Sequence, residues 1–479
     1  MKRIGILGFG IVGKSVLRFI KAYEHELSNR LFGASVALAV NVWDKKNLTE
    51  QEYALLSEYH AQHMPRVDIQ LFIDMHDFVV ASPGFDLSLY NDQSNKLLNE
   101  LDLFVPFFSK PTIGITGTLG KTSTTKLLTN MLNHVAINDY ALHFLEGGNV
   151  GTAMLDLVAQ QQEVDGAVLE LSSWQLEYNQ SFAPDIAIWT NFFPNHLDRH
   201  GTMSAYAQAK YNLMRFQSAA QHAIIADQVL CDYDARALLV DLQSRACVVT
   251  VQAREVIMPT LLWQSCDVVD VCGGWVRFSR IQNQQVVEET LLVELATLPQ
   301  STFVQNWLFV LAALKIFGVD WFVVKKELSA GQVKGVEHRL EWCAAVSGVD
   351  FYNDSKSTVI QSTQAAVEKL AGSGRPLLVI VGGLGKGADR SPLEKMLQEM
   401  PNVKKRYCFG PACAEFASCQ RFGTLEQVLD QVFVDMAPGD VVLFSPSGSS
   451  YDLFENYEHR GRVFKDLVQR KANAVQSSQ

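Results

Sequence analysis

Short apolar runs alternate with longer segments of helical periodicity in the first part of the chain. Ile4–Leu7, Val36–Val42 and Phe78–Ala81 have the length and composition of buried strands, and a helical pattern runs from Gly13 to about Tyr23. Strands that alternate with helices in this way form parallel sheets with helices on their faces. The pattern therefore predicts a Rossmann-like α/β domain whose ligands bind at the carboxyl ends of the strands.

The alternation continues in the middle of the chain from about Lys110, and a helical pattern covers Phe303–Phe317. The predicted strands there include Gly166–Leu171, Ile186–Thr190 and Ala223–Ala226. Residues 247–300 differ, because short runs alternate apolar and polar positions as half-buried antiparallel strands do. We predict a small antiparallel appendage from Cys247–Val251, Val268–Cys272, Trp275–Phe278 and Val286–Val293.

The last part of the chain predicts another α/β sheet. Its expected strands are Phe351–Asn353, Leu377–Val381, Arg406–Phe409 and Val441–Phe444. Most of them run directly into polar or glycine-rich residues, so the loops at the strand ends face one way. We therefore expect three domains: a Rossmann-like domain at 1–109, a P-loop ATPase-like α/β domain with the appendage at 110–335, and a second Rossmann-like domain at 336–479.

The glycine-rich segment at residues 112–123 carries the strongest chemical signal. A short apolar run enters a loop that closes on Gly120-Lys121-Thr122, and a helical segment follows. Backbone amides and the helix dipole converge on an anion in such a loop. Lys121 can reach the β- and γ-phosphates of a triphosphate, and the Thr122 hydroxyl can hold Mg²⁺. Because Ile115 stands where the strict motif has glycine, this is a variant P-loop. The strand before it and the helix after it favour phosphate binding over an ordinary turn.

Two further glycine segments follow predicted strands. Gly8–Gly13 has the G-x-G-x-x-G spacing, and Asp44 ends the next strand, which favours a nucleotide or its diphosphate over a tight turn that only packs a helix on the sheet. The motif does not separate NAD from another nucleotide diphosphate. Gly382–Gly387 resembles a second phosphate loop, but no Ser or Thr follows its lysine, so we interpret it as a flexible segment that presents Lys386.

Candidate metal ligands lie at the predicted strand ends of the middle region. Glu170 ends a strand beside the P-loop strand, where a carboxylate can coordinate the Mg²⁺ of a nucleotide. His196 and His200 have i,i+4 spacing, which raises the question of zinc. No glutamate general base lies between them and no third ligand is evident, so zinc is disfavoured.

Composition narrows the class of protein. The 479 residues include 48% hydrophobic and 19% charged residues, enough for several packed cores. The net charge of −10 argues against a nucleic-acid-binding surface. The eight cysteines form no C-x-x-C pair, which fits reduced thiols in a cytoplasmic enzyme. We find no signal peptide and no apolar stretch long enough to span a bilayer.

Several separated motifs, in order along all three regions, resemble those of the Mur ligases, the ATP-dependent amino-acid ligases of peptidoglycan synthesis. They are Thr116–Thr122, Glu170–Leu176, Asn195–His200, Glu337–Arg339 and Asn353–Thr358. Gly8–Gly13 with Ala81–Gly84, and Phe444–Ser450 with Phe454–Tyr457, favour the branch that adds D-glutamate to UDP-N-acetylmuramoyl-L-alanine. The resemblance implies these two substrates and ATP as ligands, in a cytoplasmic enzyme that we expect to be a monomer.

The resemblance also implies roles for individual residues. Lys121 and the rest of the loop would bind the ATP phosphates through Thr116, Gly117, Thr118, Gly120, Thr122 and Ser123. Thr122 and Glu170 would hold one Mg²⁺, and His196 would hold a second together with Lys210 carbamylated by CO₂. A carbamate turns this cation into an anion that can ligate metal. The nucleotide would be contacted by Asn306, His338, Arg339, Asp354 and Lys356.

The two substrates would bind the outer domains. The resemblance places the UDP group on Gly10, Ile11, Val12, Asp44 and Gly84, and the sugar or its diphosphate on Asn149 and His196. It places D-glutamate on Thr358, Lys386, Ser450 and Tyr457. Three positions depart from the family pattern: Leu119 replaces a small polar residue, Phe309 replaces a second Asn, and Tyr457 replaces Phe.

Three other functions fit part of the sequence. An NAD-dependent oxidoreductase would explain Gly8–Gly13 but would leave the P-loop and Lys356 unused. A non-catalytic P-loop regulator would bind ATP without turnover. A related ligase could add a different amino acid.

Overall fold

We describe a computed structural model of the chain. The described residues are 1–87, 89–90, 95–137, 140–240, 242, 246–252, 265–299, 302–330, 335–385 and 389–477. They group into two compact units, Met1–Leu298 with Val304–Val333, and Pro299–Phe303 with Lys334–Gln479. The first unit holds both the first and the second predicted domain. Because this division does not test the bounds of the three predicted domains, these bounds remain a prediction.

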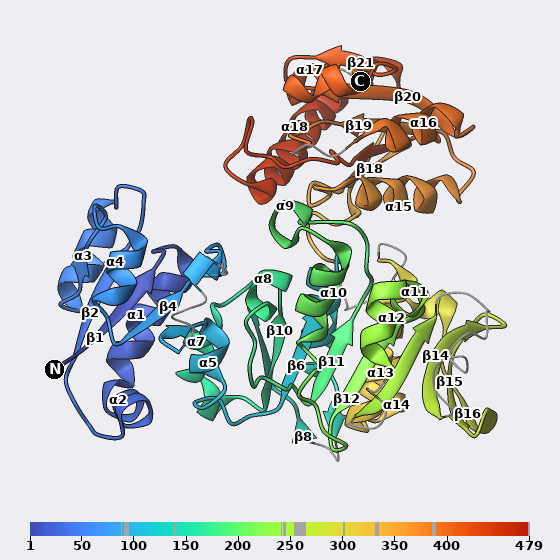
Figure 1. The fold of residues 1–479 in the computed structure, drawn as a ribbon. Helices are drawn as coiled ribbons and strands as arrows, with labels where there is room; N and C mark the ends of the chain where they lie inside the picture. The colour runs from blue at the N-terminus through green and yellow to red at the C-terminus, as the bar shows by residue number, and fades with distance from the viewer. Residues whose placement is uncertain are drawn as a thin grey trace. The chain divides into compact units, whose positions relative to one another are not determined.

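The first sheet of the first unit is entirely parallel and has the order β3-β2-β1-β4-β5. Figure 1 labels β1, β2 and β4 of this sheet. Its strands are β1 (Lys2–Leu7), β2 (Leu38–Trp43), β3 (Gln62–His63), β4 (Phe78–Ala81) and β5 (Leu97–Leu98). The accompanying helices are α1 (Ile11–Ala22), α2 (Glu24–Phe32), α3 (Glu50–Glu58), α4 (Ile69–Asp74) and α5 (Glu100–Phe104). The predicted Rossmann-like arrangement is confirmed.

A nine-stranded sheet forms the rest of the first unit, in the order β16-β15-β14-β13-β12-β11-β6-β10-β9. Its strands are β6 (Thr112–Thr116), β9 (Phe144–Gly148), β10 (Gly166–Glu170), β11 (Ile186–Trp189), β12 (His222–Ala226), β13 (Cys247–Gln252), β14 (Cys266–Cys272), β15 (Trp275–Gln282) and β16 (Gln285–Glu294). A separate short hairpin pairs β7 (Ala136–Ile137) with β8 (Tyr140–Ala141).

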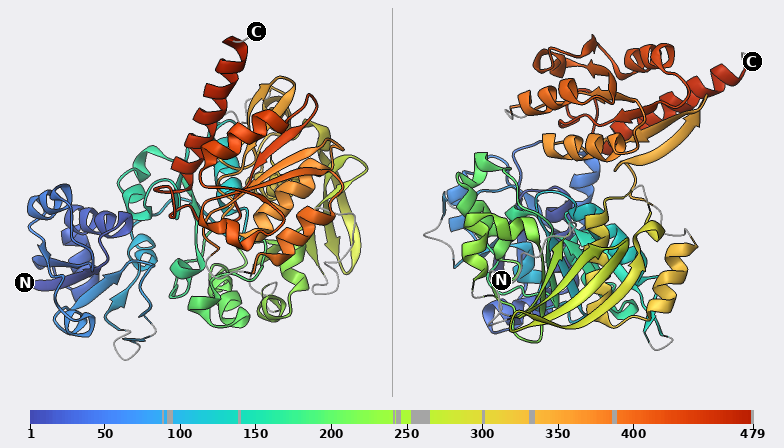
Figure 2. Two further views of the ribbon diagram at one scale, coloured as in Figure 1. Left: turned by 90° about the horizontal axis from the view of Figure 1, so that it is seen from above. Right: turned by 90° about the vertical axis from the view of Figure 1, so that its right-hand side faces the viewer.

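The predicted antiparallel segment is confirmed for β14, β15 and β16, which the right-hand view of Figure 2 shows side by side in yellow-green. The placement of Cys247–Val251 in that segment was wrong. It lies in β13, which pairs in parallel with β12 and with β14. The antiparallel strands therefore continue the central sheet, because β14 pairs with β13. Strand β13 is buried from Val248 to Gln252 and belongs to the core.

The helices of this region are short except for two that pack against each other, α6 (Lys121–Leu132) and α13 (Val304–Phe317). Helix α13 is buried from Asn306 to Leu314, as expected for a helix that is apolar on nearly all sides. The other helices are α7 (Met154–Val158), α8 (Ser173–Leu176), α9 (Leu197–His200), α10 (Met203–Tyr211), α11 (Asp227–Cys231), α12 (Tyr233–Leu239) and α14 (Trp321–Ser329).

The second unit is a six-stranded sheet in the order β17-β18-β22-β19-β20-β21. Only the pair of β17 (Glu341–Val346) and β18 (Val349–Asn353) is antiparallel among its described strand pairs. The other strands are β19 (Leu377–Val381), β20 (Val403–Phe409), β21 (Gln420–Phe422) and β22 (Val441–Phe444). The helices are α15 (Ile360–Ala371), α16 (Ser391–Glu399), α17 (Leu425–Asp435) and α18 (Tyr457–Ser477).

Alternation along β19 explains how this sheet is covered. Leu377, Val379 and Val381 face a core formed with α15 and α16, whereas Leu378 and Ile380 face a core formed with α17 and α18. Successive strand side chains point to opposite faces, so a continuous apolar run requires helices on both sides. Figure 1 shows α15 and α17 on opposite sides of the strands.

The described helices include none that is long and apolar enough to cross a membrane. All eight cysteines are free. Cys231 and Cys247 are exposed, whereas Cys266, Cys408, Cys413 and Cys419 are buried.

Gly13 and Gly10 differ in the space that a side chain would find. A Cβ at Gly13 would overlap the carbonyl oxygen of Gly8, whereas a Cβ at Gly10 would meet nothing within 4 Å. Gly13→Ala should therefore destabilise the protein by about 1–3 kcal/mol, and Gly10→Ala by less than about 0.5 kcal/mol. Thermal unfolding of the two variants measures the difference. Equal unfolding midpoints would contradict the tight turn.

Candidate active site

The loop between β6 and α6 has the backbone of a glycine loop. Gly117 has φ +145° and Gly120 has φ +80°, and α6 begins at the next residue, Lys121. A Cβ at Gly120 would lie 2.8 Å from Asn306 Oδ1, so α13 approaches the loop closely. A side chain at either glycine would be strained, which explains why the sequence has glycine there.

Two residues at the end of β11 support this loop, and our sequence reasoning did not single them out. Asn191 Oδ1 accepts from the amides of Thr118 (3.1 Å) and Leu119 (2.7 Å), and its Nδ2 donates to the Leu119 carbonyl (3.0 Å). Thr190 Oγ1 donates to the same carbonyl at 2.6 Å. The available signal was a polar pair directly after the strand that neighbours the P-loop strand.

Two lysines point at one backbone oxygen of the loop. Lys121 Nζ donates to the carbonyls of Gly117 (2.8 Å) and Thr118 (3.0 Å). Lys210, from α10, also donates to the Gly117 carbonyl at 2.8 Å, and its Nζ lies 4.5 Å from the Tyr206 ring centroid. Burial, together with the charge of Lys121, holds the pKa of Lys210 well below its usual range. Lys210 therefore gives up its proton more easily than a lysine in water.

Glu170, the last residue of β10, presents a carboxylate oxygen without a partner. The side chain is 2% exposed and its Oε1 accepts from Asn149 Nδ2 at 3.1 Å. Its Oε2 is buried and has no hydrogen-bond partner within the described part of the chain. An unsatisfied buried carboxylate oxygen is costly. A hard cation such as Mg²⁺ would satisfy it, so the residue fits the metal that we predicted.

His196 also fits a metal site. It precedes α9 in a left-handed conformation (φ +53°), and its ring packs 5.2 Å from that of Trp174. Burial, then the charges of Lys210 and Lys121, lower the pKa of His196 to about 4. The imidazole is therefore neutral at physiological pH, the form that ligates metals. His200 is engaged elsewhere, since its Nε2 lies 3.0 Å from Ser173 Oγ.

The remaining predicted residues of the loop line its start and the first turn of α6. Thr116, Thr118, Thr122 and Ser123 are all buried. Thr118 Oγ1 donates to the Phe193 carbonyl at 3.1 Å. Phe309 is 1% exposed within α13, so it belongs to the core that supports the loop.

The first sheet holds its own glycine turn. Asp44, predicted to contact a substrate, accepts from the amides of Phe9 (2.7 Å, through Oδ2) and Lys46 (2.9 Å, through Oδ1). The carboxylate therefore fixes the turn that carries Gly10, Ile11 and Val12. Ile11 is 76% exposed at the start of α1. Gly84, in the turn after β4, is exposed with nothing within 4 Å of a Cβ.

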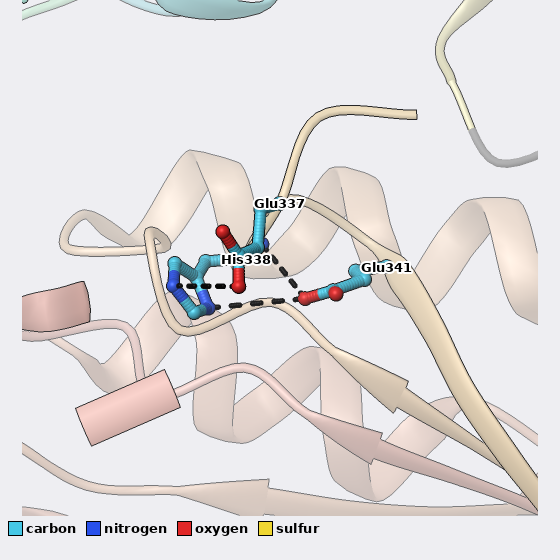
Figure 3. A group of neighbouring side chains, drawn as sticks. All are labelled: Glu337, His338 and Glu341. Atoms are coloured by element: carbon cyan, nitrogen blue, oxygen red, sulfur yellow. Dashed lines mark hydrogen bonds and ion pairs between the residues drawn. The ribbon is translucent and has the colours of Figure 1, made fainter. Parts of the chain in front are cut away.

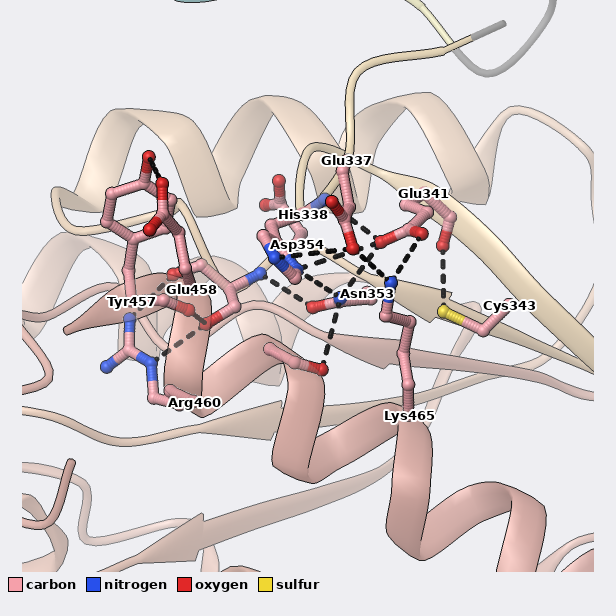
Figure 4. Close-up of polar contacts among 12 residues, drawn as sticks. Glu337, His338, Glu341, Cys343, Asn353, Asp354, Tyr457, Glu458, Arg460 and Lys465 are labelled. Atoms are coloured by element: carbon pink, nitrogen blue, oxygen red, sulfur yellow. Dashed lines mark hydrogen bonds and ion pairs between the residues drawn. The ribbon is translucent and has the colours of Figure 1, made fainter. Parts of the chain in front are cut away.

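In the second unit, the residues before β17 and after β18 meet. His338, 3% exposed with φ +62°, donates its amide to Glu341 Oε2 at 2.9 Å, and its Nδ1 lies 2.9 Å from Asn353 Nδ2 (Figures 3 and 4). The Lys356 amide donates to the His338 carbonyl at 3.0 Å. Lys356 Nζ lies 3.8 Å from the centroid of the Tyr457 ring. A cation over an aromatic face is attracted to it, so this contact orients the lysine.

Glu337, His338 and Glu341 are the one group of His, Cys, Asp and Glu ligand atoms, among the described residues, close enough to hold a metal. A lysine already lies there: Lys465 Nζ donates to Glu337 Oε1 (2.6 Å) and to Glu341 Oε1 (3.0 Å), as Figure 4 shows. The ammonium group neutralises the carboxylates, so this cluster is an ion-pair network.

Asp354 follows β18 and is enclosed. Its Oδ1 accepts from the Leu340 amide (3.1 Å) and its Oδ2 from Ser445 Oγ (2.7 Å). Burial raises the pKa of Asp354 to about 7. Arg339 comes from the same turn as His338 and contributes favourable charge to this carboxyl.

Thr358 and Ser450 lie in the loops after β18 and β22. Thr358 is exposed and Ser450 is 2% exposed. Lys386 lies outside the described residues. The structure thus brings the predicted residues into three groups: one at the first glycine turn, one at the P-loop, and one at the strand ends of the second unit.

A parallel sheet with a glycine loop that leads into a helix defines a P-loop α/β protein. Residues 115–253 match the family description "Mur ligase middle domain", and residues 338–448 match "Mur ligase, glutamate ligase domain". The chain belongs to the Mur ligase family, whose members are ATP-dependent amide-bond-forming ligases.

Curated relatives extend the match. The chain is 34% identical to UDP-N-acetylmuramoylalanine--D-glutamate ligase of Koribacter versatilis over 412 residues, which covers 83% of this chain and 84% of the relative. It is 30% identical to the protein of the same name from Acidobacterium capsulatum over 485 residues, with 98% and 96% covered. These matches favour a ligase over an NAD-dependent oxidoreductase or a regulator.

Solved structures agree on the fold. A crystal structure of MurF from Acinetobacter baumannii has a TM-score of 0.55 at 17% identity and covers 90% of each chain. A MurF ligase from Thermotoga maritima in complex with ADP has a TM-score of 0.53 at 15% identity, and the match covers 91% of this chain and 96% of that one.

Asp354 makes stability depend on pH. Because burial raises its folded-state pKa to about 7 from 3.8, the protonated carboxyl stabilises the folded protein at low pH, and this stabilisation is lost as pH rises through about 7. Asp354→Asn should remove this contribution.

Between pH 5 and pH 8, which bracket the folded-state pKa of about 7, the thermal unfolding midpoint of the wild type should fall more than that of Asp354→Asn. Glu100, with a pKa also raised to about 7 by burial, titrates in both proteins and cancels in the difference. Parallel pH profiles would show that Asp354 is ionised in the folded state at all of these values.

Proposed function

We propose that this protein joins D-glutamate to UDP-N-acetylmuramoyl-L-alanine, with ATP converted to ADP and phosphate, in the synthesis of peptidoglycan precursors. The observation that carries the proposal is the group at the P-loop, where a buried lysine with a lowered pKa, a carboxylate oxygen without a partner and a neutral histidine surround a phosphate-binding loop. Relatives at 30–34% identity over most of the chain bear the name of this activity.

ATP binding follows from the loop. Its phosphates would lie against Gly117–Ser123, where Lys121 offers a positive charge and the N-terminus of α6 offers backbone amides. Asn306 lies beside Gly120 and is within reach of the same nucleotide. From the second unit, His338, Arg339, Asp354 and Lys356 would contact the nucleotide or the transferred phosphoryl group.

Mg²⁺ would be held by Thr122 and Glu170, and a second ion by His196 and the modified Lys210. Bound there, the ions would neutralise phosphate charge that otherwise repels an incoming carboxylate. Glu170 and His196 are suited to this role because one carries an unsatisfied oxygen and the other stays neutral.

Lys210 would be carbamylated. Its neutral amine nitrogen attacks the carbon of CO₂, an N–C bond forms, and the nitrogen releases a proton to solvent, which leaves a carbamate anion. Burial favours this step because it keeps the amine unprotonated and therefore nucleophilic. The Gly117 carbonyl and the Tyr206 ring hold the amine in place.

The reaction then proceeds in two displacements. The carboxylate of the alanyl group attacks the γ-phosphorus of ATP, and ADP leaves from an acyl phosphate. The amine of D-glutamate attacks the acyl carbonyl, and the tetrahedral intermediate expels phosphate and releases a proton. Because three ligands must meet and water must be kept out, we expect the domains to close during the reaction.

The two substrates would be bound by the outer predicted domains. The domain at 1–109 would bind UDP through the turn that Asp44 fixes and through Gly84, with Asn149 and His196 on the sugar diphosphate. The domain at 336–479 would bind D-glutamate through Thr358, Lys386, Ser450 and Tyr457. We propose a cytoplasmic monomer that binds neither nucleic acid nor membrane.

The choice of amino acid tests the function. Phosphate release from ATP and UDP-N-acetylmuramoyl-L-alanine should require D-glutamate, and L-alanine, meso-diaminopimelate or L-lysine should not replace it. Lys121→Ala should lower kcat at least ~100-fold, because it removes a group that stabilises the transferred charge. Lys126→Ala, an exposed lysine on the same helix, is the matched control. Turnover with another of these amino acids would refute the proposed specificity.

Carbamylation of Lys210 has its own readout. Protein equilibrated with ¹³C-bicarbonate should give a carbamate carbon signal that Lys210→Ala lacks, while Lys126→Ala retains it. The signal should grow as pH rises through the lowered pKa, since the free amine is the reactive form. A wild-type spectrum without this signal would rule out the modification and leave the rest of the proposal standing.

A further inference from the structure

Two buried guanidinium groups join the loops at the carboxyl edge of the second-unit sheet. Arg390, which precedes α16 and is 2% exposed, donates through Nη2 to the carbonyls of Gly383 (2.8 Å) and Ser447 (3.4 Å). Gly383 follows β19 and Ser447 follows β22. The arginine therefore bridges two loops that come from neighbouring strands.

Arg460, in α18, extends this bridge to a third loop. It is fully buried and donates through Nη1 to the Gly448 carbonyl after β22 (2.9 Å). Its Nη2 and Nε donate to the carbonyl (2.7 Å) and the hydroxyl (3.0 Å) of Ser355 after β18. The Ser355 hydroxyl in turn donates to the Tyr457 carbonyl at 2.8 Å. Figure 4 shows Arg460 among the polar contacts near Tyr457.

Backbone hydrogen bonds tie the same loops together. The Gly382 amide donates to the Pro446 carbonyl at 2.9 Å, and Leu384 and Ser449 exchange two bonds of 2.9 Å each. The loops after β19 and β22 therefore form one piece, with Ser450 directly after it.

Glycines make room for the guanidinium groups. A Cβ at Gly448 would overlap Arg390 Nη2 and lie 2.7 Å from the Gly383 carbonyl, and a Cβ at Gly383 would lie 2.8 Å from Arg460 Nη1. Any side chain at these positions would push the loops apart. Because the guanidinium groups fit this closely, they act together with the backbone hydrogen bonds in setting the spacing of the loops.

Burying two cations is costly. Carbonyl oxygens offset the cost for Arg460 and for Nη2 of Arg390, whereas Nε and Nη1 of Arg390 have no hydrogen-bond partner among the described residues. Arg390 has a carboxylate at longer range, with its Nε 3.5 Å from Glu415 Oε2, and its guanidinium lies 5.3 Å from the Phe416 ring centroid. Charge-assisted bonds to carbonyls are stronger than neutral ones. Since hydrophobic residues of similar size often stabilise a core as well as a buried charge does, geometry is the better reason for these arginines.

We propose that Arg390, supported by Arg460, is a positioning residue for the amino-acid substrate: it sets the spacing of the loops after β19 and β22 and so fixes Ser450. This inference rests on the proposed function, in which Ser450 and Tyr457 bind D-glutamate. We give Arg390 no direct contact with the substrate, because its side chain is buried at 2% exposure.

The opposite edge of the same sheet supplies a matched control. Arg375 donates through Nε to the Gly439 carbonyl (2.8 Å) and through Nη2 to the Asp440 carbonyl (3.0 Å), both before β22. Its Nη1 pairs with Asp350 of β18 at 2.5 Å. It therefore braces the amino ends of strands whose carboxyl ends Arg390 and Arg460 brace.

The test compares Arg390→Met, Arg390→Lys and Arg375→Met in the full-length enzyme. Arg390→Met should raise the KM for D-glutamate about tenfold or more, because a small misplacement of a binding group is costly. The KM for ATP should stay within about twofold, since the described contacts of Arg390 involve neither the P-loop nor the second-unit residues proposed to bind the nucleotide. Arg390→Lys, which keeps a cationic donor, should recover most of the D-glutamate KM. Arg375→Met should lower the thermal midpoint without a change in that KM.

Three results would overturn the inference: an unchanged D-glutamate KM in Arg390→Met, an equal rise in Arg375→Met, or equal rises for ATP and D-glutamate. If Arg390→Met fails to fold, Gly448→Ala tests the same spacing and should raise the D-glutamate KM, whereas an unchanged KM there would overturn it. Wild-type enzyme without D-glutamate-dependent turnover would refute the proposed function itself, whereas normal wild-type turnover with unaffected variants refutes only the role of Arg390.

Discussion

Two lysine side chains that share one carbonyl oxygen set the electrostatics at the P-loop of the first unit. Lys121 and Lys210 both donate to Gly117, and only Lys121 is near solvent. Like charges at such a spacing repel strongly where water is excluded. Lys210 is the one that yields, because burial already penalises its charge. The loop thus has two lysines in different surroundings: Lys121, which is partly exposed, and Lys210, whose charged form is disfavoured by burial.

The residues around the P-loop differ in whether they leave a polar group open or support the loop backbone. Glu170 and His196 lie at the ends of elements that flank the loop. Glu170 keeps a carboxylate oxygen without a hydrogen-bond partner among the described residues, and His196 is neutral. The Asn191 carboxamide holds the loop backbone so that Lys121 and the α6 terminus keep a fixed relation. Similar support recurs elsewhere: the Asp44 carboxylate holds the first glycine turn, and Ser445 with Asp354 holds the strand ends of the second unit. Each sheet therefore uses side chains, rather than further secondary structure, to shape its ligand edge.

Much of this was accessible from the sequence. The P-loop, Glu170 and the three sheets follow from apolar runs that end in glycine or polar residues, because local pattern fixes strands and their ends. The parallel pairing of β13 could not be read from alternation alone, since strand direction depends on partners far along the chain. Asn191, Arg390 and Arg460 were missed for a similar reason. Their partners are backbone carbonyls or amides of distant loops, and a backbone group has no signature in sequence.

The burial of some cysteines and the exposure of others would allow opening of the second unit to be measured by thiol labelling. Burial raises the pKa of Cys419 to about 12 and that of Cys408 further, so both resist alkylation while the second unit stays closed around them. Cys231 and Cys247 are exposed in the first unit and remain open to reagents. Fast alkylation would therefore report on the exposed cysteines. Slow alkylation of Cys408 and Cys419 would report how often the core of the second unit opens.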